Sequence, residues 1–226
     1  MGWLEFIAAF AGFFLSHSLP IRPAVKSRIV AVLGPRGFTI AYSILSLAVL
    51  YWLLTAAGRA PTVTLWDWAP WQNHVPLIAM GMVCILLALT IARPNPFSFG
   101  GAHNDRFSPD HPGLIRWTRH PILAAFAIWA LAHIVPNGDL AHVILFGAFA
   151  GFSLLGMRLI DRRKRREMGA EWERQRQALR SGPLFHSPAS LPEAALRAIL
   201  GILTYAALLR LHPLIFGVSP YLMLPH

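Results

Sequence analysis

Residues 140–168 decide the fold class of this chain, and they read LAHVILFGAFAGFSLLGMRLI followed by DRRKRREM. The first part, residues 140–160, is apolar and long enough to cross a bilayer, which takes about 20 residues. The second part opens with Asp161 and five consecutive basic residues. An apolar run that ends in a basic cluster is typical of a membrane helix whose end faces the cytoplasm.

Composition extends this conclusion to the whole chain. Hydrophobic residues make up 55% of the 226 residues and charged residues only 13%, with a mean hydropathy of +0.50. A soluble domain carries about 25% charged residues, so a water-soluble fold is excluded. The net charge of +10 is explained by basic cytoplasmic loops, and no nucleic-acid partner is predicted. The single cysteine, Cys84, excludes an internal disulfide.

The predicted fold is an all-α, polytopic membrane helical bundle that forms one integral-membrane domain over residues 1–226. Basic residues gather in alternate loops, most densely in a cytoplasmic loop over residues 161–193, and this alternation places both termini on the periplasmic side. The six expected transmembrane spans cover residues of about 3–20, 37–57, 75–92, 121–136, 140–160 and 194–211.

Within the basic loop, Met168, Trp172 and Leu179 fall on one narrow helical stripe. This pattern predicts a basic helix that lies in the membrane interface and contacts membrane lipid. Binding of a phosphate, a carboxylate or an anionic cofactor is the alternative for the same segment.

Histidines within the apolar runs are the most informative polar residues, because ionisable groups at membrane depth are costly. His17 and His120 fall at the cytoplasmic ends of their spans, whereas His133, His142 and His74 fall near the outer ends. His120 and His133 are separated by about 20 Å along one helix. They therefore belong to two different clusters that cannot share one metal ion.

His120 stands directly before Pro121 and is therefore expected at the N-cap of a helix. The positive end of the helix dipole favours the neutral imidazole there, which is the form that binds metals. Arg116 and Arg119 stand close by in the sequence and are suited to clamp carboxylates.

His17 continues a stripe of phenylalanines at helical spacing, which would form an apolar wall with an imidazole at its rim. A heme needs such a wall, an axial nitrogen, and cations near its propionates, a role open to Arg22, Arg116 and Arg119. The plainer alternative is that the histidines make hydrogen bonds between helices. The members of the stripe are Phe6, Phe10, Phe13 and Phe14.

Three blocks of the chain resemble the signatures of the NnrU family, a group of bacterial membrane proteins linked to denitrification and nitric oxide metabolism. They are FLSHSLPIR at residues 14–22, LIRWTRHP at residues 114–121 and WALAH at residues 129–133. The same blocks resemble the 15-cis-zeta-carotene isomerase of plants and cyanobacteria. The resemblance covers most of the chain and implies a multi-pass protein of the bacterial inner (plasma) membrane.

The resemblance implies non-covalent heme b, with His17 and His120 as metal ligands and catalytic residues. It implies a redox-gated cis–trans isomerase acting on a hydrophobic polyene or another small molecule, or a factor in denitrification. Arg22, Arg116, Arg119 and His133 are the further cofactor-binding candidates.

Two alternatives stay open. Residues 119–121 followed by GAEWE at residues 169–173 resemble the isoprenylcysteine type of membrane methyltransferase, which would use S-adenosylmethionine. A non-enzymatic role in the assembly or electron supply of a nitrite or nitric oxide reductase fits the histidines as well.

Overall fold

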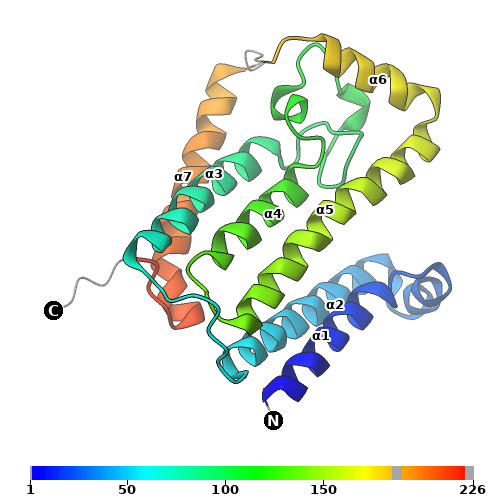
Figure 1. Ribbon diagram of the computed structural model, residues 1–226. Helices are drawn as coiled ribbons and strands as arrows, with labels where there is room; N and C mark the ends of the chain where they lie inside the picture. Colours follow the sequence, from blue (N-terminus) through cyan, green and yellow to red (C-terminus); the bar gives the residue numbers. More distant parts are fainter. Residues whose placement is uncertain (1, 185–189, 222–226) are drawn as a thin grey trace. The chain divides into compact units, whose positions relative to one another are not determined.

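The computed structural model of the protein describes residues 2–184 and 190–221. Within these residues it contains α-helices and short 3-10 turns but no β-sheet, so the predicted all-α class is confirmed (Figure 1). The described residues form seven α-helices: α1 Gly2–Ser18, α2 Pro23–Arg59, α3 His74–Thr90, α4 Pro121–Ile134, α5 Leu140–Met168, α6 Ala170–Ser181 and α7 Leu191–Phe216.

Every predicted span coincides with a helix, and four helical segments in the described part of the chain are long and apolar enough to cross a membrane. These are Pro23–Arg59, Pro70–Thr90, Leu140–Met168 and Leu191–Phe216. The chain is therefore a multi-pass membrane protein. The other two helices, α1 with 17 residues and α4 with 14, fall short of the usual length of about 20. Six spans with both termini in the periplasm stay a prediction.

Two helix boundaries differ from the sequence prediction. Helix α2 begins at Pro23 rather than near residue 37 and kinks at Gly34, whose φ is 70°, because Pro35 cannot continue the hydrogen-bond ladder. Helix α5 continues past residue 160 to Met168, because no breaker occurs before Gly169. The predicted basic loop 161–193 is therefore largely helical, formed by the end of α5 and by α6.

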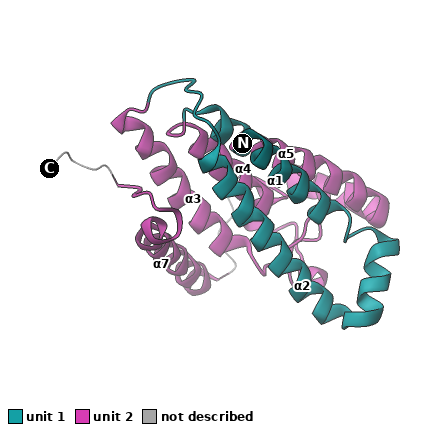
Figure 2. Ribbon diagram, turned by 90° about the horizontal axis from the view of Figure 1, so that it is seen from below, with its two compact units in different colours: residues 1–67, 138–145 teal, residues 68–137, 146–226 magenta. Residues whose placement is uncertain are grey.

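The described helices form two compact units (Figure 2). Unit 1 comprises residues up to 67 and residues 138–145, and α1 packs beside α2 in it. Gly2 lies so close to the backbone of Arg59 that a Cβ there would be 2.4 Å from the carbonyl oxygen. Glu5 binds the Arg59 side chain at 2.5 Å. The two helices are thus held together by close contact at this end.

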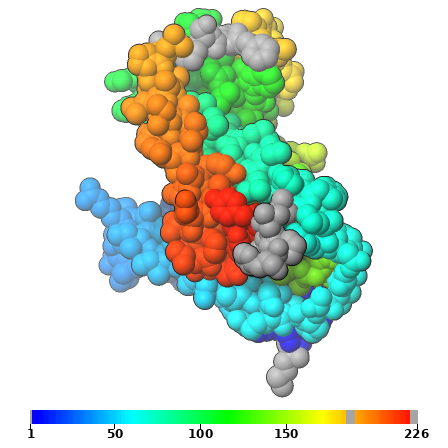
Figure 3. Space-filling view, turned by 90° about the vertical axis from the view of Figure 1, so that its left-hand side faces the viewer, coloured from blue at the N-terminus to red at the C-terminus, as the bar shows by residue number. Residues whose placement is uncertain are grey.

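Unit 2 comprises residues 68–137 and the chain from residue 146 onward. In it α3 packs against both α4 and α7, and Figure 3 shows α7 as an orange-to-red column beside α3. Gly201 of α7 allows a close approach, since a Cβ there would lie 3.0 Å from the Cys84 carbonyl oxygen. Tyr205 donates its hydroxyl to the Leu77 carbonyl at 2.8 Å, which fixes the register of the two helices.

Residues 91–120 and α6 together form a cap on unit 2, which we call the cap from here on. Trp172 and Leu179 of α6 are buried against Phe97 and Ile115 of the connecting segment. Three guanidinium groups surround the Trp172 ring, at 5.1–5.9 Å from its centroid, and belong to Arg119, Arg165 and Arg176. The apolar stripe of α6, which the sequence assigned to lipid contact, therefore packs against protein instead. The reason is that residues 91–120 supply an apolar surface that covers it.

Candidate functional site

His17 lies in the last turn of α1 and is half-buried. Its Nδ1 is 2.8 Å from the carbonyl oxygen of Phe13, so Nδ1 carries the proton and donates it when the ring is neutral. The Nε2 atom then presents a lone pair. A hydrogen bond that fixes the tautomer and the ring orientation is what metal-ligating histidines usually have.

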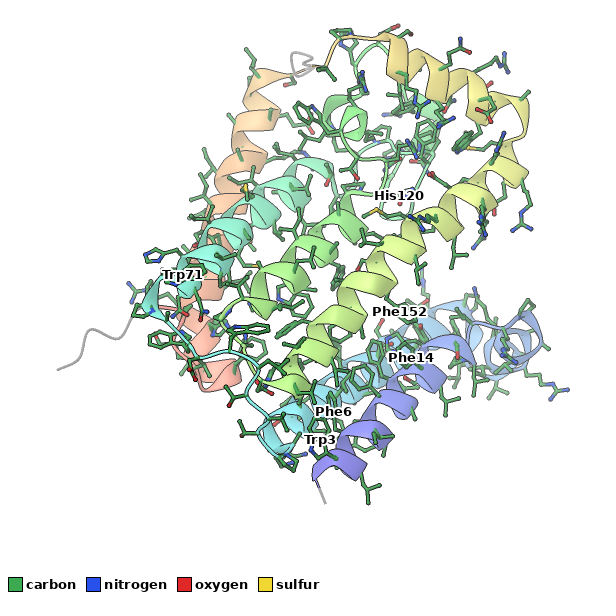
Figure 4. All side chains as sticks on the ribbon, in the orientation of Figure 1. Trp3, Phe6, Phe14, Trp71, His120 and Phe152 are labelled. Atoms are coloured by element: carbon green, nitrogen blue, oxygen red, sulfur yellow. The ribbon has the colours of Figure 1, made fainter. Side chains whose placement is uncertain are left out.

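Aromatic rings surround this imidazole within unit 1. The Phe13 ring stacks on His17 with centroids 4.1 Å apart, and Tyr42 of α2 stands edge-on at 6.1 Å. Along α1, the ring of Phe10 contacts those of Phe6 and Phe14 at 4.9 and 5.9 Å, and Figure 4 shows Phe6 and Phe14 on this helix. The predicted aromatic stripe is therefore a continuous row of rings that leads to His17.

His120 is placed at the N-cap of α4, as predicted, and its side chain is only 4% exposed. The ring is bonded at both nitrogens. Nδ1 is 3.0 Å from the hydroxyl oxygen of Ser98, and Nε2 is 3.0 Å from a carboxylate oxygen of Asp161. Figure 4 shows His120 at the start of α4 beside α5, the helix that carries Asp161.

Asp161 joins His120 to Arg119. The guanidinium of Arg119 donates two hydrogen bonds to the carboxylate, at 2.5 and 3.2 Å. The side-chain amide of Asn95 donates to the Arg119 carbonyl at 3.0 Å and so fixes the backbone next to His120. Ser98, His120, Asp161 and Arg119 thus form one polar network, which we call the cap network.

Burial lowers the pKa of His120 below its usual value, and the Asp161 carboxylate opposes part of this effect. Burial therefore favours the neutral form of the ring, which is the form that the helix N-terminus also favours. A neutral ring whose Nε2 faces a carboxylate donates from Nε2 and accepts the Ser98 hydroxyl proton at Nδ1. Both nitrogens are then engaged, so His120 offers no lone pair to a metal in this arrangement.

The remaining predicted site residues are spread over both units. Arg22 is exposed at the N-cap of α2. Arg116 donates to the carbonyl oxygens of Arg180 and Gly182, at 3.3 and 3.4 Å, and so contacts the C-terminal end of α6. A cation at that end is favoured by the helix dipole. Of the predicted set, only Arg119 and His120 meet in one network within a unit.

His133, in the last turn of α4, repeats the arrangement of His17 in a different place. Its Nδ1 is 2.7 Å from the carbonyl oxygen of Trp129, which leaves Nε2 with the lone pair. The rings of Trp129 and Phe146 lie 5.5 and 5.4 Å from the imidazole. The predicted cofactor-binding role of His133 stays a prediction.

The three histidines lie in a region of the chain that matches a known protein family. The model of the family described as NnrU protein matches residues 5–220. The chain belongs to the NnrU family. His17, His120 and His133 all lie within the matched residues. No curated protein and no solved structure matches the chain.

For this NnrU chain, the sequence reasoning missed Ser98 and Asp161. Asp161 carried a signal, because it is an acidic residue at the boundary between an apolar run and a basic cluster. Ser98 carried none, since a serine in a loop is ordinary. The residues described include no group of three or more His, Cys, Asp or Glu side chains able to hold a metal ion.

In the methyltransferase alternative, residues 169–173 would contact S-adenosylmethionine. The acidic side chains of this segment have partners within the NnrU chain. Glu171 accepts hydrogen bonds from Arg174 and Gln175 on its own helix. Glu173 pairs with Arg165 at 2.6 Å. The Glu173–Arg165 pair links α6 to the end of α5, and the methyltransferase alternative stays a prediction.

Proposed function

We propose that this NnrU protein binds heme b in the membrane and that the imidazole of His17 would hold its iron. The observation that carries the proposal is the 2.8 Å contact of His17 Nδ1 with the Phe13 carbonyl, which leaves Nε2 as a preset electron-pair donor. The row of rings along α1 supplies the apolar surface that a flat macrocycle requires. When bound, heme would supply one-electron redox chemistry at its iron.

The chain's own groups have separate tasks in this proposal. Phe13 orients the imidazole of His17 through its carbonyl oxygen and stacks its ring on that imidazole. The cap network holds a proton on Nε2 of His120, and Asp161 keeps that proton in place. His17 belongs to unit 1 and His120 to unit 2, and a shared iron between them stays a prediction.

Absorption spectra of the purified protein test the proposal. We expect wild-type protein titrated with hemin in detergent to develop a Soret band, and His17→Ala to lose it. His142→Ala is the matched control, because His142 pairs with Asp139 at 2.5 Å and has no part in the proposal. A His17→Ala variant with the wild-type spectrum refutes the proposal.

The variant His120→Ala tests in the same experiment whether His120 is a second ligand of the iron. If His120 binds the iron, the ferric spectrum changes from the six-coordinate, bis-imidazole form to a five-coordinate form. If His120 acts only within the cap network, the spectrum stays that of the wild type while the protein unfolds at a lower temperature. The two outcomes are distinct because the first is spectral and the second is a change in stability.

The cis–trans isomerase role and the denitrification role deepen the same proposal. Both follow from the resemblance of the histidine blocks. The isomerase role requires the heme first, whereas a role in the assembly or electron supply of a reductase is open with or without heme. Heme-loaded protein in liposomes, supplied with a poly-cis polyene and a reductant, tests the first role by chromatography of the isomers. Loss of nitrite or nitric oxide reductase activity in cells that lack the protein tests the second.

A further inference from the structure

A row of three arginines on α5 has no partner in the part of the chain that the structure describes. Arg158, Arg162 and Arg166 follow one another at intervals of four residues, so they lie on one face of the helix. All three are exposed. Neighbouring arginines in this row are about 6 Å apart along the axis.

The adjacent basic residues are, in contrast, neutralised by carboxylates. Arg163 and Lys164 both pair with Glu167, at 2.6 and 3.1 Å, and Arg165 pairs with Glu173. Asp161 is occupied by Arg119 and His120. Each acidic side chain at residues 161–173 thus has a cation other than the three arginines in the row.

Like charges four residues apart on a helix repel each other, so the row is unfavourable unless an anion lies beside it. The helix places the row where such anions occur. From Leu140 to Arg158 the axis rises about 27 Å, close to the thickness of the hydrocarbon layer. If the hydrocarbon layer begins at Leu140, Arg158 stands at the level of the lipid phosphates, with Arg162 and Arg166 beyond it.

The apolar part of the same face suits the rest of a lipid. Leu154 lies one turn before Arg158 and is 51% exposed, and Leu155 and Leu159 are exposed by 57% and 61%. The face therefore changes from leucine to arginine at the depth where a phospholipid changes from acyl chain to phosphate. Guanidinium groups bind phosphate through two parallel hydrogen bonds, which ammonium groups cannot do.

We propose that this face of α5 is a binding site for an anionic phospholipid, with the headgroup phosphate bound by the arginine row and an acyl chain along the leucines. The site is independent of the heme. Its ligand is a lipid of the inner leaflet rather than free phosphate, because the apolar part of the face is needed as well.

Native mass spectrometry of delipidated protein, titrated with phosphatidylglycerol or phosphatidylcholine, tests the site. We expect the wild type to prefer phosphatidylglycerol by about 100-fold, given three cations at the surface. The variant R158Q/R162Q/R166Q is expected to lose this preference. The control R163Q/K164Q/R174Q removes the same charge from residues that already have carboxylate partners, and it is expected to keep the preference.

Equal losses in the two variants would show general attraction by net charge and overturn the proposal. Competition by millimolar inorganic phosphate would overturn the lipid as ligand. Should the glutamine variant fail to fold, R158K/R162K/R166K keeps the charge and loses the paired hydrogen bonds. It is expected to bind phosphatidylglycerol about tenfold more weakly, and unchanged binding would contradict the site.

Discussion

Replacing Asp161 with alanine removes the one carboxylate that serves both His120 and Arg119. The Nε2 proton of His120 then has no acceptor, and the His120 side chain is only 4% exposed, so water does not replace the lost partner readily. Arg119 is 28% exposed and recovers part of its hydration. An unsatisfied buried donor costs about 1–3 kcal/mol, and the partly exposed cation adds about 1 kcal/mol.

The expected loss is therefore about 2–4 kcal/mol in the free energy of unfolding. For a chain of this size it corresponds to a fall in the melting temperature of roughly 5–12 °C. Heme-free protein in detergent, melted with circular dichroism at 222 nm as the signal of helix content, provides the assay. Glu167→Gln is the matched control on the same helix, because its partners Arg163 and Lys164 lie at the surface, and no resolvable shift is expected.

A double-mutant cycle makes the test specific to the network. If Asp161 and His120 stabilise each other, His120→Ala combined with Asp161→Ala costs less than the sum of the two single changes. Strictly additive costs, or equal melting temperatures for Asp161→Ala and Glu167→Gln, would refute the reasoning.

Three further predictions concern the cap, the kink and pH. Trp172→Ala is expected to cost about 3–5 kcal/mol by emptying the centre of the cap, whereas Trp71→Ala, on a side chain 61% exposed, should leave the thermal melt unchanged; similar melts would contradict the packing. Gly34→Ala is expected to cost about 1–2 kcal/mol because of the positive φ, while Gly58→Ala, at a helical position with free space, should be neutral or stabilising. Because burial lowers the pKa of His120, the unfolded chain binds this proton more readily. Stability of the heme-free protein should therefore be full above about pH 6.5 and fall below it. A fall as large in His120→Ala would assign the effect to other groups.

Local sequence patterns were sufficient to predict the helices, the place of His120 and the row of rings that leads to His17. The apolar runs predicted every membrane helix to within a few residues at most ends, because burial in lipid depends on composition rather than on distant contacts. Pro121 fixed the start of α4 and put His120 at its N-cap. The spacing of the phenylalanines predicted the row of rings on α1.

Contacts between distant parts of the chain were beyond such patterns. His120 contacts Asp161, which lies 41 residues further along the chain, and Ser98, which lies 22 residues before it. Whether these side chains meet depends on the path of the cap and on the register of α5. The stripe of Trp172 and Leu179 was correctly identified as apolar and wrongly assigned to lipid.

The sequence by itself thus determined that this is an all-α membrane protein, where its apolar helix faces lie and that His120 stands at a helix N-cap. Only the tertiary structure decided what those groups touch. The physical reason is that hydrophobicity and helix period are properties of neighbouring residues, and a protein core and a bilayer are equally apolar surroundings for a side chain. Hydrogen-bond partners, in contrast, are chosen by geometry that appears only once the helices have packed.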